Sequence, residues 1–454
     1  MASVSETLAD WLVRLDAHAL PEDARRGTLF SLIDTVGLAY AARREDYMGM
    51  LVAGWDAGVG KATAYGHGRA LDAASAAMIN GTGAHGEDFD NTYEGCPVHS
   101  GAVVVPAVLA LSEERGIPGR RAFAAMAAGI EVMCRMGLVA GTNVHKSGFH
   151  PTAVIGAMGA AAAAGVALGL DRAGLVNAFG LAGSMASGII EYLADGSWTK
   201  RMHAGWAAQA GIRAARMAGA GFRGPVTVFE GTHGFYFAFA GDPRPDVSPL
   251  VDNLGKTWEA GRLSFKPYAC GTMCQPYIDC AIRLAAGGVT ADDIAAITCK
   301  VGEGTVHRLW APVELKRRPP SAYGGKFSGP YCVAVGFLDG DAGLAQFTEA
   351  RVRDAAVLAL AAKVSYEVDP ENEYPANYTG HVRAVLRDGT VREEFQPCLR
   401  GGTREPLTRD DIVRKFHANL AYGGMDAVRA EKLLVLLESY PRLDSPGSLA
   451  LLRD

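Results

Sequence analysis

The chain of 454 residues is 49% hydrophobic and 20% charged, which is typical of a globular protein long enough for two or three domains. Its formal net charge of −5 excludes a strongly basic protein, and we expect no nucleic-acid partner. The eight cysteines form neither a Cys-x-x-Cys pair nor a zinc-ligand spacing, so we expect reduced, buried thiols.

The N-terminal region predicts helices that pack through small residues. Residues 1–20 have the spacing of an amphipathic helix and lack the basic and apolar segments of a secretory signal, so we expect a cytoplasmic location. Pro21 suits the first turn of a helix over residues 22–44. Similar helices, rich in alanine and glycine, follow as far as about residue 265, and their small side chains allow the axes to approach closely.

One of these helices is apolar enough to raise the question of a membrane. Residues 153–170, "AVIGAMGAAAAAGVALGL", are eighteen residues without a charge, near the lower limit for a spanning helix. Alanine and glycine gain little from transfer to lipid, and no basic or aromatic girdle flanks the segment. The stretch therefore predicts a buried helix and no membrane partner.

After residue 265 the pattern changes from helices to a mixture of helices and strands. Residues 293–304 predict a strand, and residues 381–395 alternate around Asp388-Gly389, which predicts a β-hairpin. Thr408 is a suitable N-cap for a returning helix. We expect a mostly α fold: a large all-helical domain from residues 1–265, completed by 405–454, and an inserted smaller α+β lid domain at 266–404.

The most polar segment between two apolar helices is "GEDFDNTYEGCPVHSG", residues 86–101. If the preceding helix continues, His85, Asp88 and Thr92 share one of its faces, because they are three and four residues apart. The plainer interpretation is a polar helix end in which Asp90 and Asn91 cap a turn.

Three further polar segments lie at predicted helix ends. His150 precedes the Ala-rich helix, Lys200 and His203 begin another, and Lys266 lies at the expected domain boundary. Helix N-termini favour anions, and these side chains add cations and proton carriers. The four segments together predict a site for a small anion, although a lone lysine or histidine usually has no such role.

The quoted segments also carry a resemblance to a known family. "NGTGAHGEDFDNT", "HSGAVVVPAVLAL", "GFHPTAVIGAMGAAAAAGVALGLD", "TKRMHAGWAAQAG", "FKPYACG" and "FSGPYCVAVGFLDG" occur in the order found in the MmgE/PrpD family. This family includes 2-methylcitrate dehydratase, cis-aconitate decarboxylase and iminodisuccinate epimerase. The resemblance implies a helical domain formed by both chain ends, an inserted α+β lid, a homodimer, and neither metal nor organic cofactor.

The resemblance also implies which residues act. The catalytic candidates are Asp88, His99, His150, Lys200, Lys266 and Tyr331, and the substrate-binding candidates are Thr92, His203 and Lys326. Tyr323 is an alternative to Tyr331. Asn91 follows Asp90 where the family usually has a second aspartate, and Ser100 follows His99 where it usually has a proline, so one negative charge near the site is lost.

The implied substrate is a small di- or tricarboxylate. Removing a proton or a carboxylate beside another carboxylate leaves a carbanion or enolate, which positioned cations and donors stabilise. We expect a lyase that dehydrates a 2-methylcitrate-like hydroxy acid; decarboxylation of a cis-aconitate-like acid and epimerisation of a dicarboxylate such as iminodisuccinate are the alternatives. His99 or His150 would transfer the proton, and Lys200 and Lys266 would hold carboxylates.

Two hypotheses from other classes stay open. His85, Asp88, Asp90 and His99 could bind a divalent metal in a hydrolase, although the spacing His-x-x-x-His is absent. The chain could also be a helical protein that binds carboxylates without turnover.

Overall fold

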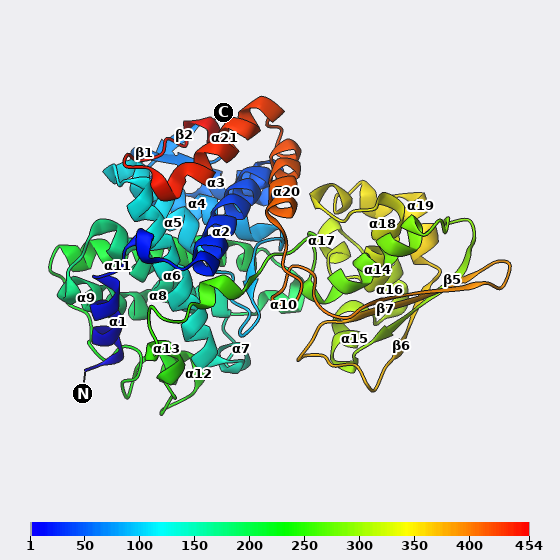
Figure 1. The fold of residues 1–454 in the computed structure, drawn as a ribbon, viewed down its shortest axis with the longest axis horizontal. Coiled ribbons are helices and arrows are strands. Elements are labelled where there is room, and N and C mark those ends of the chain that lie inside the picture. The colour runs from blue at the N-terminus through cyan, green and yellow to red at the C-terminus, as the bar shows by residue number, and fades with distance from the viewer. Residues whose placement is uncertain (1, 454) are drawn as a thin grey trace. The chain divides into compact units, whose positions relative to one another are not determined.

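A computed structural model describes residues 2–453 of the chain (Figure 1). The chain forms two compact units. Unit 1 contains the chain up to Gly86, residues Asp90–Ser264 and the chain from Ile412 onward; unit 2 contains Glu87–Phe89 and Phe265–Asp411. The fold is mostly helical, as predicted, and its strands are few and short.

Unit 1 is almost entirely helical. Its helices are α1 (Val4–Leu12), α2 (Glu22–Ala41), α3 (Asp46–Gly54), α4 (Ala73–Gly86), α5 (Ser100–Arg115), α6 (Gly119–Ala140), α7 (Asn143–Lys146), α8 (Pro151–Leu168), α9 (Arg172–Met185), α10 (Tyr192–Asp195), α11 (Thr199–Gly219), α12 (Phe235–Ala240), α13 (Ser248–Val251) and α21 (Ala427–Ser439). Helix α20 (Arg409–Tyr422) begins in unit 2 and continues in unit 1. Two small antiparallel pairs are β1 (Val59–Ala64) with β2 (Arg69–Leu71), and β3 (Thr92–Tyr93) with β4 (Leu263–Ser264).

The centre of unit 1 is a group of helices with small side chains at their contacts. Helix α11 packs against both α4 and α8, and α8 also packs against α5 and α6. A Cβ added at Gly205 would lie 2.1 Å from the carbonyl oxygen of Met78, so glycine is required where α11 crosses α4. This close packing brings the ends of several helices to one place, which positions the candidate site.

The apolar helix expected at residues 153–170 is α8, and its residues are nearly all buried. Helices α6 and α8 are long and apolar enough to span a membrane, but 89% of the apolar window of each is buried inside the protein. The prediction of a buried core helix is therefore confirmed.

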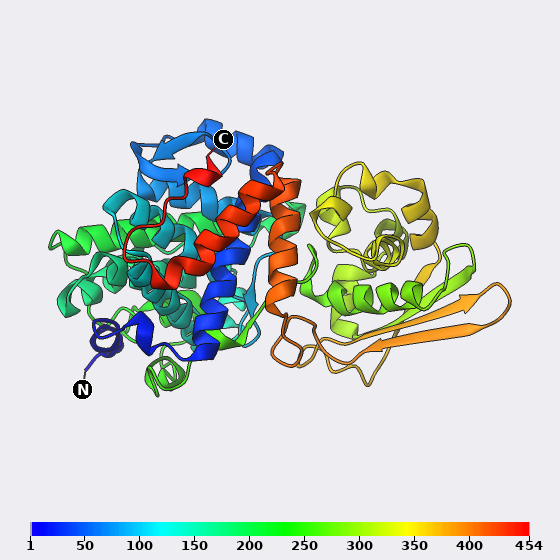
Figure 2. The same cartoon turned by 45° about the horizontal axis from the view of Figure 1, so that its top comes forward.

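Both chain ends contribute to unit 1. Helix α21 packs against α2, and the orange and red C-terminal helices lie beside the blue N-terminal one (Figure 2). Lys415 of α20 and Asp34 of α2 form a buried ion pair at 2.7 Å.

Unit 2 combines one mixed sheet with short helices. The strand order is β6 (Val364–Val368), β5 (Ile294–Val301), β7 (Gly380–Leu386) and β8 (Val391–Gln396); β5 and β6 are parallel and the other pairs antiparallel. Its helices are α14 (Gln275–Ala286), α15 (Glu303–Leu309), α16 (Val313–Arg317), α17 (Ala322–Gly325), α18 (Gly329–Asp339) and α19 (Ala355–Ala361). The predicted strand and hairpin are confirmed as β5 and as β7–β8, and Gly389 provides the positive φ of the turn.

Candidate active site

Four buried histidines converge in unit 1. His85 lies in the last turn of α4, His99 precedes α5, His150 precedes α8, and His203 lies early in α11. The ring centroid of His85 lies 4.8 Å from that of His99 and 5.5 Å from that of His150, and the ring centroids of His150 and His203 are 5.2 Å apart. The packing of α4, α5, α8 and α11 thus assembles side chains that are far apart in the sequence.

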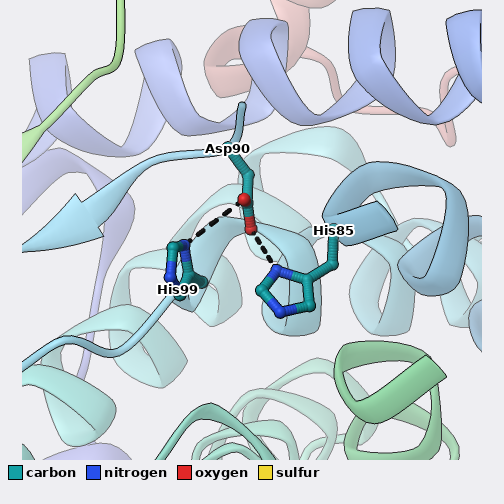
Figure 3. A group of neighbouring side chains, drawn as sticks. All are labelled: His85, Asp90 and His99. Atoms are coloured by element: carbon teal, nitrogen blue, oxygen red, sulfur yellow. Dashed lines mark hydrogen bonds and ion pairs between the residues drawn. The ribbon is translucent and has the colours of Figure 1, made fainter. Parts of the chain in front are cut away.

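Asp90 links two of these imidazoles (Figure 3). Its Oδ2 lies 2.8 Å from Nδ1 of His85, and its Oδ1 lies 3.3 Å from Nδ1 of His99. Burial alone would raise the pKa of Asp90, but the interactions with His99 and His85 outweigh burial and hold it well below its usual value. Asp90 is therefore an anion that orients both rings.

His150 and His203 face each other through their Nδ1 atoms, 3.1 Å apart. One nitrogen must donate and the other must accept, so the two rings cannot both be protonated in this arrangement. Burial lowers the pKa of His150 well below its usual value and that of His203 to about 4; neighbouring histidines and Lys200 add to both shifts. These imidazoles are consequently neutral at pH 7.

A pocket of about 550 Å³ in unit 1 is lined by one of these histidines, His203. His203, Tyr192, Met202, Trp206 and Gly188 are among the residues that line it. Gly188 has a φ of +134°, and an added Cβ would lie 2.5 Å from Cβ of Ala153 and 3.3 Å from Nε2 of His203, so only glycine suits this position. The volume is in the range that small-molecule sites occupy.

The polar segment at residues 86–101 does not continue the helix. Helix α4 ends at Gly86, Asp88 has a positive φ of 56°, and Thr92 lies in β3 opposite Ser264. The shared helical face of His85, Asp88 and Thr92 required the helix to continue, and it is therefore not formed. Glycine favours a helix end, and aspartate is among the few residues that tolerate the left-handed region.

A second group of predicted residues lies in unit 2. Nζ of Lys266 donates to the carbonyl oxygen of Asp88 at 2.7 Å and lies 3.4 Å from its Oδ1. Nζ of Lys326 donates to the carbonyl oxygen and to Oε2 of Glu87, both at 2.7 Å. Both lysines are buried, so each holds one residue of the Glu87–Phe89 segment through a buried ion pair.

Tyr331 has a different environment from the other candidates. Its side chain is fully buried in α18, its hydroxyl donates to the carbonyl oxygen of Gln346 at 2.6 Å, and its ring packs against Phe347. The hydroxyl proton of Tyr331 is thus already donated in a hydrogen bond within the core of unit 2. The alternative, Tyr323, packs its ring against Phe327.

Comparison with known proteins decides the family. The MmgE/PrpD N-terminal domain profile matches residues 6–248, and the MmgE/PrpD C-terminal domain profile matches residues 268–438. The chain belongs to the MmgE/PrpD family. It is similar to a protein named cis-aconitate decarboxylase from Aspergillus terreus, with 27% identity over 97% of this chain and 94% of that protein. Proteins of the same name from Mus musculus and Homo sapiens are 30% and 29% identical over 76% of this chain and 71% and 72% of their own lengths.

Three residues of this MmgE/PrpD chain were not among the site residues expected from its sequence. His85 and Asp90 were considered as metal ligands, as part of a helical face or as a cap, and Glu87, the partner of Lys326, was not considered. The spacing His85-x₄-Asp90-x₈-His99 carries a signal in retrospect, since a carboxylate between two histidines in one polar loop can orient both.

His85, Asp90 and His99 are the group among the described residues that could hold a metal ion, because their ligand atoms all lie within 4.8 Å of one another. The geometry fits hydrogen bonding better. Two ligands of a tetrahedral zinc ion, each at about 2.0–2.1 Å, lie about 3.3 Å apart. The 2.8 Å separation of Nδ1 of His85 and Oδ2 of Asp90 is that of a hydrogen bond, whereas the 3.3 Å between Nδ1 of His99 and Oδ1 of Asp90 fits either arrangement.

Proposed function

We propose that this chain is a lyase that acts on a small carboxylate, specifically a decarboxylase of a cis-aconitate-like tricarboxylate. The observation that carries the proposal is the similarity to a cis-aconitate decarboxylase over 97% of the chain. The comparisons support an enzyme of this broad class. The buried histidine cluster supplies groups that the reaction needs.

The reaction needs one proton and no external electrons. In a cis-aconitate-like acid, one carboxylate sits on a methylene next to a double bond. Loss of this carboxylate as CO₂ leaves an electron pair that forms a new double bond to the methylene carbon. The former double-bond pair then takes a proton at the far carbon, so a trianion and one proton become a dianion and CO₂.

We assign the proton to His99. The anionic carboxylate of Asp90 lies 3.3 Å from its Nδ1, which stabilises a protonated ring and leaves Nε2 to donate. His150 is neutral, and its Nδ1 is hydrogen-bonded to His203. His150 can therefore form a hydrogen bond through Nε2 without taking the proton that we assign to His99. Lys200, the second residue of α11, adds a positive charge that favours the anionic substrate.

Dehydration of a 2-methylcitrate-like hydroxy acid is the second candidate. The neutral imidazole of His150 favours it, because a buried neutral histidine can accept a proton from a carbon beside a carboxylate. Both reactions use the same cluster, and they differ in the leaving group.

The deciding experiment offers purified protein cis-aconitate, 2-methylcitrate and citrate in separate assays. We expect release of one CO₂ for each cis-aconitate consumed, with incorporation of one deuteron into the product in deuterated water. Growth of ultraviolet absorbance from 2-methylcitrate without CO₂ would instead establish the hydro-lyase. Activity that disappears with chelator and returns with a divalent metal would contradict the proposed chemistry.

A further inference from the structure

Asn91 joins helix α2 to the start of α5 through its side-chain amide. Its Nδ2 donates to Oγ of Ser31 at 2.7 Å, and its Oδ1 accepts from the N–H of Gly101 at 3.1 Å. The residue is 1% exposed, so solvent does not replace either bond. A Cβ at position 101 would lie 2.9 Å from Oδ1 of Asn91, and the close approach therefore depends on glycine there.

The two partners fix which way the amide points. The backbone N–H of Gly101 can only donate, so it must face Oδ1. The hydroxyl of Ser31 already donates to the carbonyl oxygen of Gly27 at 2.8 Å, so it accepts from Nδ2. Position 91 therefore needs one acceptor and one donor, which asparagine has and a carboxylate lacks.

These bonds leave the ring of His99 available. His99 occupies the N-cap position of α5, where a side chain commonly accepts from the first turn, but it makes no such bond. The N–H of His99 instead donates to Oγ1 of Thr152 at 3.1 Å, and Asn91 accepts from Gly101. The first turn of α5 is thus capped from outside, and the ring of His99 faces Asp90.

We propose that Asn91 is a positioning residue for proton transfer by His99. Asn91 fixes the position of the first turn of α5, and this turn holds the ring of His99 against Asp90. The inference rests on the proposed function, in which His99 donates the proton.

The uncharged amide has a second consequence. The titratable and charged groups around His99 are Asp90, His85 and His150, and Lys200 acts on the same cluster. A carboxylate at position 91 would place a second anion next to Asp90 in the chain. Negative charge favours a protonated imidazole over a neutral one, so the added anion would stabilise the charged form of the His99 ring.

Two substitutions separate position from charge. Asn91→Ala removes both bonds, and we expect kcat on the best substrate to fall about tenfold or more, with KM changing less than about threefold. Asn91→Asp keeps the acceptor for Gly101 and adds a charge, and we expect the pH profile of kcat to move by about one unit toward higher pH. Ser31→Ala is the matched control, because it leaves the bond to Gly101 intact; its kcat should stay within about threefold.

Imidazole NMR titration of His99 provides a readout that needs no turnover. At one fixed pH it should show a larger protonated fraction of the His99 ring in Asn91→Asp than in wild type, and a displaced His99 resonance in Asn91→Ala. If the wild-type protein consumes none of the acids, the proposed function fails while this titration still tests Asn91. A lower melting temperature in Asn91→Ala, with unchanged kcat, pH profile and His99 titration, would make Asn91 structural only and overturn the inference.

Discussion

The histidine cluster of unit 1 and the lysine pairs of unit 2 use buried charge in opposite ways. In unit 1, one carboxylate serves two imidazoles, and the rings beyond it have lowered pKa values. In unit 2, each lysine has its own carboxylate: Lys266 pairs with Asp88, and Lys326 with Glu87. Imidazoles can change charge near neutral pH, whereas such ion pairs keep theirs.

This difference indicates that the histidine cluster takes part in the reaction, whereas the lysines hold a segment of the chain in place. A proton donor must be able to lose its charge during the reaction, and the cluster around Asp90 has that property. The lysines hold a three-residue segment, Glu87–Phe89, whose backbone includes the left-handed Asp88. Substitution in unit 1 should therefore reduce turnover, and substitution in unit 2 should first reduce stability.

The largest expected effect concerns turnover in unit 1. His99→Gln removes the proposed proton donor, and we expect kcat to fall by about 10²–10⁴-fold, since general acid catalysis contributes that much. The melting temperature should fall only modestly, because Asp90 loses one of its two imidazole partners but keeps the 2.8 Å contact with His85. His18→Gln, at an exposed position, is the matched control and should keep full activity. If His99→Gln kept the wild-type turnover, the proton donor would have to be another group.

The next effect is a loss of stability in unit 2. Lys266→Met leaves Asp88 without its buried cation and removes a donor to its carbonyl oxygen, which should cost about 3–5 kcal/mol of unfolding free energy. Urea unfolding measures this cost, with the exposed Lys256→Met as control. Unchanged stability together with a hundredfold loss of turnover would show that Lys266 takes part in the reaction and does not mainly hold the Glu87–Phe89 segment in place.

Much of the helical framework could be predicted because it depends on local pattern. The Ala-rich helix α8 and the hairpin around Asp388-Gly389 follow from apolar spacing and turn chemistry. His150 and His203 were expected at one site from their places at helix ends, and His99 from the family resemblance. Their contacts could not be predicted, because they depend on how α4, α5, α8 and α11 pack.

The failures came from conformation rather than composition. The shared face of His85, Asp88 and Thr92 depended on a helix that continued past Gly86, but Asp88 adopts a positive φ, and single-residue backbone states of this kind have a weak sequence signal. An aspartate is common both in exposed turns and in buried hydrogen-bonded clusters. The sequence around Asp90 therefore could not show whether Asp90 caps a turn or pairs with two histidines.

A smaller effect concerns the pH dependence of stability. The pKa of His203 falls from about 6.5 in the unfolded chain to about 4 in the folded protein, so the unfolded state binds more protons between these values. Stability should therefore decrease as pH falls from about 6.5 toward about 4. In His203→Gln this decrease in melting temperature should be weaker. An identical slope in both proteins would mean that His203 is readily protonated in the folded state.

The smallest expected effect tests whether Tyr331 takes part in chemistry. Tyr331→Phe removes one hydrogen bond to the carbonyl oxygen of Gln346, which should cost about 1 kcal/mol of unfolding free energy. Because the hydroxyl proton is used within the core of unit 2, kcat should stay within about threefold. Tyr366→Phe is the matched control, since Tyr366 is a half-buried tyrosine of the same unit whose ring packs against Trp310. A hundredfold loss of kcat in Tyr331→Phe alone would show that its hydroxyl leaves Gln346 during the reaction, and that unit 2 supplies chemistry as well as anchoring.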